Sequence, residues 1–203
     1  MNIEVKIDKE LIPYNRAIKT LQNRVDSIKK GKDADLLWIL EHPTTFTAGI
    51  RSNKKDILDK KIKIINTNRG GKITLHSPGQ KIIYFVIDLN KRKRDIRKLI
   101  TQIEKSIVDF LSIYRINAVA DRKNIGVWVK GKKIAAIGIK VSKWIAYHGC
   151  SINISNDLNK YKKIVPCGLD NKKVTSVYQE NKKIIKNVNN NLKDIFLRNI
   201  NKI

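Results

Sequence analysis

The spacing of apolar residues predicts three amphipathic helices. In each of three stretches, apolar side chains recur every three or four positions, which is the spacing of one helix face. These stretches cover residues 13–30, 96–111 and 184–200. Pro13 suits a first helical turn and Gly31 a C-terminal cap, so the first helix has both ends marked. Each helix has one apolar face with which to cover a sheet.

Short apolar and β-branched runs predict strands between the helices. The predicted strands cover residues 36–40, 62–65, 82–89, 126–129, 133–141 and 146–154. Lys130-Gly131-Lys132 separates two of them and indicates a hairpin. Without a repeat or a linker, this mixture predicts an α/β (α+β) fold, with residues 1–203 forming one domain.

The composition is strongly basic and changes the choice of partners. The chain has 43 Lys and Arg residues against 18 Asp and Glu, a formal net charge of +25. Such a charge suits nucleic acid or acidic proteins. The lysines are dispersed along the chain, and the sequence contains no RNP block, helix-turn-helix pattern or zinc finger. A basic nucleic-acid-binding domain is therefore the weaker alternative, and we expect no nucleic-acid partner.

Neither a membrane anchor nor a cofactor motif is evident. Residues 1–10 include three acidic side chains, and no run approaches the ~20 apolar residues of a membrane span. Cys150 and Cys167 are the only cysteines, without a CxxC or Cys/His cluster, and no Walker or GxGxxG motif is present. We therefore expect a cytoplasmic protein with reduced cysteines. We also expect it to bind no membrane, metal or other cofactor.

Pro166-Cys167-Gly168 is the strongest candidate for chemistry. Proline fixes the backbone before the cysteine and glycine leaves space after it, which is how a nucleophile is presented. A free thiol has a pKa near ~8.5, and a nearby ammonium group favours the reactive thiolate. Lys133 is the candidate for that ammonium. A lone cysteine is more often a small buried hydrophobe, so the surrounding sequence has to decide.

Four ordered blocks resemble the signature blocks of the lipoyl(octanoyl) transferase family. They cover residues 69–80, 133–138, 148–149 and 166–169, the last followed by Val174-Thr175-Ser176, and residues 41–49 resemble a further block. The resemblance implies the fold shared by lipoate and biotin transferases and ligases, with a mixed central sheet covered by helices. It places the acyl-substrate pocket at Arg69, Gly70, Gly71, Lys72, Ile73, Thr74, Leu75, His76, Ala136, Ile137, Gly138, His148, Gly149, Cys150 and Ser151.

The resemblance also implies an activity. Members move an octanoyl group from octanoyl-acyl carrier protein to a lysine of a lipoyl domain, through a cysteine thioester. The acceptors are E2 subunits of 2-oxoacid dehydrogenases and the glycine-cleavage H protein. Cys167 matches the family nucleophile, and Lys133 the residue that lowers the thiol pKa and acts as general acid and base. The alternative enzyme is an ATP-dependent lipoate–protein ligase of the same fold, which needs no cysteine.

Some positions leave alternatives open or depart from the family. The small residues of the segment 134–138 leave room for an acyl tail or for close sheet packing, and His76 fits either a pocket wall or a structural role. Ser77 stands where the family usually has glycine, and Lys140 where arginine is common. Cys150 replaces a larger apolar residue.

Overall fold

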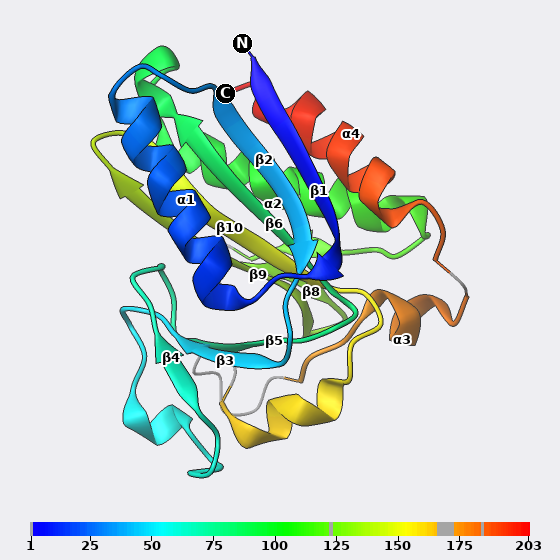
Figure 1. The fold of residues 1–203 in the computed structure, drawn as a ribbon. Coiled ribbons are helices and arrows are strands. Elements are labelled where there is room, and N and C mark those ends of the chain that lie inside the picture. Colours follow the sequence, from blue (N-terminus) through cyan, green and yellow to red (C-terminus); the bar gives the residue numbers. More distant parts are fainter. Residues whose placement is uncertain (1, 122–123, 166–172, 184) are drawn as a thin grey trace.

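A seven-stranded mixed sheet forms the centre of the described residues. The computed structural model describes residues 2–121, 124–165, 173–183 and 185–203 (Figure 1). The strand order is β1-β2-β6-β10-β9-β8-β7, in which β1 and β2 are parallel and the other neighbours antiparallel. Its strands are β1 (Ile3–Leu11), β2 (Asp35–Glu41), β6 (Gln80–Asp88), β7 (Val119–Ala120), β8 (Val127–Val129), β9 (Lys132–Ser142) and β10 (Ile145–Asn153).

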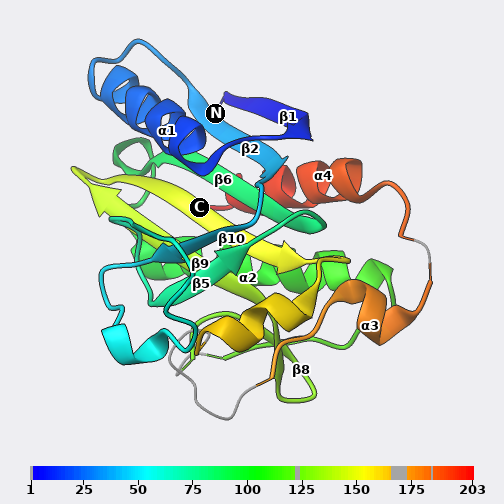
Figure 2. The same cartoon turned by 60° about the horizontal axis from the view of Figure 1, so that its bottom comes forward.

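Helices cover both faces of this sheet, as Figure 2 shows. α1 (Tyr14–Lys29) packs on one face, and α2 (Ile96–Ile113) and α4 (Val188–Ile200) pack on the other. Successive side chains of a strand point to opposite faces, so β2 supplies Leu36, Trp38 and Leu40 to the α1 side. Its other apolar residues, Leu37 and Ile39, point to the opposite face and pack in the core beneath α2 and α4. Burial on both faces explains why β2 reads as a continuous apolar run.

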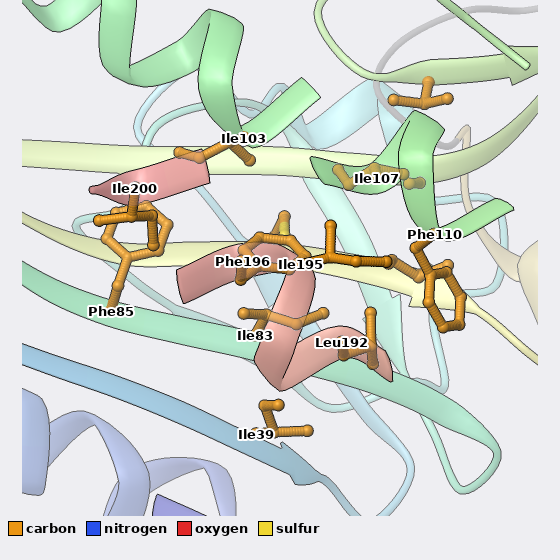
Figure 3. Close-up of a cluster of buried hydrophobic side chains, with 14 of the residues drawn as sticks. Ile39, Ile83, Phe85, Ile103, Ile107, Phe110, Leu192, Ile195, Phe196 and Ile200 are labelled. Atoms are coloured by element: carbon orange, nitrogen blue, oxygen red, sulfur yellow. The ribbon is translucent and has the colours of Figure 1, made fainter. Parts of the chain in front are cut away.

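The larger hydrophobic core lies between the sheet and the pair α2 and α4. In Figure 3, Ile83 and Phe85 of β6 lie beneath side chains of both helices, among them Ile103 of α2 and Phe196 of α4. Phe85 and Phe196 are fully buried. Truncation of either ring to alanine would cost about 3–5 kcal/mol of stability, so this core fixes the strands that carry the site.

A small second sheet packs below the end of the central one (Figure 1). Among the described residues it has three strands in the order β4-β3-β5. They are β3 (Thr45–Ala48), β4 (Ile64–Asn66) and β5 (Ile73–His76), and the short helical segments are η1 (Lys54–Asp56), η2 (Leu89–Lys91), η3 (Leu158–Lys163) and α3 (Val177–Asn181). Ile73 and Leu75 of β5 pack with Phe46 and Ile164 in a separate apolar cluster.

Most of the predicted elements are confirmed. The first two predicted helices correspond to α1 and α2, and the third begins at Val188 rather than at Ile184, which lies outside the described residues. The predicted hairpin turns at Lys130 and Gly131, which both have positive φ, so the strand after it starts one residue earlier than expected. The fold class is confirmed, whereas the single domain over residues 1–203 stays a prediction. No helix of the described residues is long and apolar enough to cross a membrane.

Sequence analysis did not identify β1, β3, β5 or β7. β1 alternates apolar and polar residues at the sheet edge, and its parallel pairing with β2 joins segments separated by all of α1. β3, β5 and β7 have only two to four residues each, too few for a period to stand out. β3 and β5 nevertheless place part of the site.

Candidate active site

Two adjoining cavities lie between β9, β10 and the small sheet. The first, which we name the Arg69 cavity, is lined by Arg69, Gly71, Lys72, Thr74, His76, Ile82, Tyr84, Ala136, Ile137, Gly138, His148, Gly149, Cys150 and Ser151. The second, the Lys133 cavity, is lined by Thr74, Lys133, Ile134, Ala135, Ala136, Ser151, Asn153, Tyr161 and Val174. Thr74, Ala136 and Ser151 belong to both walls, so the two cavities adjoin.

Glycines hold the Arg69 loop against β9. The amide of Gly70 donates to the carbonyl of Ile139 (3.3 Å), and a Cβ at Gly138 would lie 3.0 Å from the Gly70 carbonyl. Arg69 reaches back to β3, where its Nη2 donates to the carbonyl and the hydroxyl of Thr47, both at 2.9 Å. The small residue at Gly138 therefore serves the close approach of this loop, which brings two separate sequence blocks to one cavity.

Gly149 has a different packing role. It faces Gly138 across the β9–β10 pair. A Cβ at Gly149 would overlap the backbone carbonyl of Ile83 on β6. This glycine allows β6 and β10 to approach closely beside the Arg69 cavity, which it lines.

Four aromatic side chains, Tyr14, His42, His76 and Tyr84, form what we name the histidine–tyrosine cluster at the cavity. His76 stacks on Tyr14 with ring centroids 5.9 Å apart and meets the edge of His42 at 5.5 Å. His42 Nδ1 donates to the Ile12 carbonyl (2.6 Å), so its Nε2 accepts from the Tyr84 hydroxyl (2.9 Å). Of these four, His76 and Tyr84 reach the cavity wall.

Burial keeps the histidines of this region neutral. Burial lowers the pKa of His76 to about 3, with His42 and Arg69 adding to the shift, and lowers the pKa of His42 to about 4. His148 lies 2.8 Å from the Asn68 side-chain oxygen through its Nε2. Its pKa is lowered to about 4, first by burial and then by Arg69 and Lys140. The histidines of the cavity wall are therefore uncharged at neutral pH, and the basic side chains of that wall are its arginine and its lysine.

Cys150 is poorly suited to nucleophilic chemistry. Its side chain is only 4% exposed and packs into the main hydrophobic core as well as the cavity wall. Burial raises the pKa of the Cys150 thiol above its ordinary value, which disfavours the thiolate. The predicted nucleophile, Cys167, lies outside the described residues.

Lys133 is joined to the segment that follows Cys167. Its backbone amide donates to the carbonyl of Lys173, and its carbonyl accepts from the amide of Thr175, both at 2.9 Å. Lys133 and Cys167 are 167 − 133 = 34 residues apart in sequence. Pairing with Lys173 reduces this separation to 173 − 167 = 6 residues of chain.

The Lys133 side chain is buried at the edge of its cavity. It is 8% exposed, and its Nζ donates to the carbonyl of Ile125 at 3.0 Å. Nζ also lies 5.2 Å from the centroid of the Trp128 ring. The Lys133 amine is thus a buried, hydrogen-bonded group of the site and not a solvated surface charge.

Comparison with known proteins identifies the family. Residues 13–197 match the model of the lipoyl protein ligase A/B catalytic domain. The chain belongs to this family. It is 42% identical to an octanoyltransferase of Anaplasma phagocytophilum over 183 residues, covering 87% of this chain and 88% of the relative. It is 42% identical to an octanoyltransferase of Wolbachia pipientis, with 84% and 86% covered.

Solved structures show the same fold at low sequence identity. A lipoate-protein ligase A bound with ATP superposes with a TM-score of 0.75 at 17% identity, covering 98% of this chain and 86% of the ligase. A bipartite lipoate protein ligase of Thermoplasma acidophilum gives 0.76 at 17% identity, with 99% and 84% covered. Biotin protein ligase of Aquifex aeolicus gives 0.55 at 16% identity, with 99% and 71% covered. The lipoyl protein ligase A/B family therefore shares its architecture with biotin ligases.

The structure gathers most of the residues that sequence analysis placed in this family's pocket. Gly70, Ile73 and Leu75 do not line the cavities. Gly70 belongs to the Arg69 loop and packs against β9. Ile73 and Leu75 point to the opposite face of β5 and pack in the apolar cluster described above. Within β5, Ile73 and Leu75 alternate with the cavity residues Thr74 and His76, which explains why part of a contiguous block is excluded.

Sequence analysis missed several residues of the site. Ile82 and Tyr84 line the Arg69 cavity, yet they lie in a run that was assigned only to a buried strand. Their spacing of two and the polar hydroxyl of Tyr84 were the available signals. Gly126 was also missed, although a Cβ there would lie 2.6 Å from Lys133 Cε. Among the described residues, no group of three or more His, Cys, Asp or Glu side chains could hold a metal ion.

Proposed function

We propose that this chain is an octanoyltransferase of protein lipoylation that carries its acyl group on Cys167. Octanoyl transfer as the activity rests on relatives of that name at 42% identity over most of both chains. The observation that supports the site is the backbone pairing of Lys133 with Lys173 and Thr175, just beyond the segment that contains Cys167. The finer assignments, the thioester, the donor and the acceptor, are parts of this proposal.

In the first half-reaction, the Cys167 thiolate attacks the carbonyl carbon of octanoyl-acyl carrier protein. A thioester forms on Cys167 as the bond to the phosphopantetheine sulfur breaks. Lys133, as an ammonium, gives its proton to the departing thiolate and becomes a neutral amine. The carrier protein leaves with a free thiol.

In the second half-reaction, the neutral amine of a lipoyl-domain lysine attacks the Cys167 thioester. An amide bond forms, the bond to the Cys167 sulfur breaks, and the acceptor nitrogen loses one proton to the Lys133 amine. The enzyme returns to its thiolate and ammonium forms. One lysine therefore serves as acid and base in turn, so the cycle requires neither ATP nor a metal.

The octanoyl chain occupies the Arg69 cavity in this proposal. That cavity adjoins the Lys133 cavity through Thr74, Ala136 and Ser151, so the acyl chain and the reacting carbonyl have adjacent places. Neutral imidazoles of His76 and His148 avoid placing charge against the alkyl chain. Binding of the chain positions its carbonyl for both attacks.

The proposed donor is octanoyl-acyl carrier protein, and the proposed acceptors are lipoyl domains of E2 subunits and the H protein in the cytoplasm. A relative in fold is named as a lipoate protein ligase with its E2 lipoyl domain, which supports an acceptor of that kind. The net charge of +25 favours acidic protein partners.

The test is transfer by the purified full chain. Incubated with octanoyl-acyl carrier protein and a lipoyl domain, it should add one octanoyl group to the lipoyl domain, as measured by mass spectrometry. Octanoate with ATP and Mg²⁺ should give no product. Product from octanoate and ATP alone would favour the ligase alternative and contradict the proposal.

A further inference from the structure

The Lys133 amine packs against the segment from Ile125 to Trp128. The carbonyl of Ile125 accepts from Nζ at 3.0 Å, and the Trp128 ring lies 5.2 Å away. Gly126 lies between these two residues in sequence, and a Cβ there would lie 2.6 Å from Lys133 Cε, 3.1 Å from Nζ and 2.7 Å from the backbone carbonyl of Ala135. A side chain at this position therefore forces the Lys133 amine, the β9 backbone at Ala135 or both to shift.

The contacts form one connected unit. The indole N–H of Trp128 donates to the carbonyl of Asn124 at 3.0 Å, next to the carbonyl that holds Lys133. The Asn124 side chain donates to Asp121 at 2.9 Å, and the Asp121 amide donates to the Gly126 carbonyl at 3.3 Å. Trp128 thus contacts the amine through its ring face and the backbone of Asn124 through its indole N–H.

Strand register explains why this unit meets Lys133. Trp128 pairs with Lys133 across the β8–β9 hairpin, and the register shifts between Val127 and Trp128. Gly126 directly precedes this irregularity and has a φ of +141°, a conformation that L side chains rarely adopt. Glycine at this position provides both the backbone conformation and the empty space beside Lys133.

We infer that Gly126 and Trp128 are positioning residues that orient the Lys133 amine for its role as acid and base. Ile125 offers a carbonyl oxygen, and Trp128 a ring face, both of which attract an ammonium group. Displacement of the amine removes the alignment that proton transfer requires. The inference rests on the proposed function of Lys133.

Gly126→Ala tests the inference through its dependence on Lys133. Single-turnover octanoyl transfer should fall about 10-fold or more in Gly126→Ala. The same change in a Lys133→Met background should cause less than about a twofold further loss, because the amine is already absent. Gly131→Ala is the matched control, since Gly131 also has positive φ in this hairpin but its Cβ meets nothing within 4 Å. It should transfer within about twofold of the wild-type rate.

Two variants of Trp128 provide an independent test if Gly126→Ala does not fold. Trp128→Phe keeps a ring beside the amine, whereas Trp128→Leu removes it. Only Trp128→Leu should displace the pH profile of transfer from that of the wild type.

Three outcomes overturn the inference. They are equal losses from Gly126→Ala with and without Lys133, a wild-type rate in Gly126→Ala, and identical pH profiles in both Trp128 variants. A wild-type rate in Lys133→Met would instead remove Lys133 from the proposed function.

Discussion

The two adjoining cavities are built by different means. The walls of the Arg69 cavity are fixed by backbone contacts, with Gly138 against the Arg69 loop and Gly149 against β6, and its histidines are neutral. In the Lys133 cavity, the Lys133 amine is held by the Ile125 carbonyl and the Trp128 ring. Under the proposed function, the first cavity serves recognition and the second serves chemistry. Changes in the first cavity should then alter which acyl group is accepted, and changes at Lys133 should alter transfer itself.

The largest effect is expected at Lys133. Lys133→Met should lower octanoyl transfer about 100-fold or more, because general acid and base catalysis is typically worth that much. Lys133→Arg keeps a positive charge that does not deprotonate, so thioester formation should survive better than transfer to the acceptor lysine. Single-turnover kinetics of the two half-reactions measure the split. Wild-type transfer by Lys133→Arg would contradict a role as base.

Gly138→Ala should change acyl selection instead. The added methyl group meets the Gly70 carbonyl at 3.0 Å and narrows the Arg69 cavity. We expect kcat/KM for octanoyl transfer to fall about 10-fold, with a smaller loss for a butanoyl donor. Competition between the two donors measures the ratio. Equal losses for both chain lengths would show that the change acts on the fold and not on recognition.

Stability should depend on pH through the neutral histidines. Burial holds the pKa of folded His148 at about 4, below its ordinary value of 6.5. As pH falls below about 6.5, His148 of the unfolded chain binds a proton before His148 of the folded chain does. The folded protein is therefore most stable above that pH, and its free energy of unfolding falls by up to about 1.4 kcal/mol per pH unit between about 6.5 and 4. His148→Asn, which tolerates the positive φ at this position, should lose less stability from about pH 7 to about pH 5.

Urea midpoints at the two pH values measure this difference. The same loss in His148→Asn and wild type would mean that His148 does not contribute. His42 and His76 carry similarly lowered pKa values, so some pH dependence should remain in the variant.

The smallest effect concerns neither cavity and serves to separate encounter from chemistry. Exposed charges are screened over about 10 Å at 0.1 M salt, so a chain at +25 should meet an acidic carrier protein more slowly as salt increases. The rate at subsaturating carrier protein should fall with salt, while single-turnover transfer from preformed thioester to a saturating lipoyl domain should not. Salt-independent rates at subsaturating donor would exclude electrostatic steering.

How far sequence could predict this molecule differs between the two cavities. Apolar spacing predicted α1 and α2, and continuous apolar runs predicted β2 and β6, because these elements bury whole faces. The resemblance grouped the walls of the Arg69 cavity, but a block in sequence includes both faces of β5, so Ile73 and Leu75 were assigned to the pocket although they point away.

The surroundings of Lys133 were less accessible to sequence analysis. Trp128 and Gly126 read as parts of a plain strand, and their contact with the amine depends on a register shift between β8 and β9. No local pattern encodes that shift. The backbone link from Lys133 to Lys173 and Thr175 is likewise a tertiary contact, which only the folded chain shows.

The central claim is that Cys167 carries the acyl group while the buried Cys150 only packs. Intact-mass spectrometry after mixing the full chain with octanoyl-acyl carrier protein, without an acceptor, tests it most directly. The wild-type protein and Cys150→Ala should each gain one octanoyl group, and Cys167→Ala should gain none. An adduct that persists in Cys167→Ala and disappears in Cys150→Ala would contradict the account.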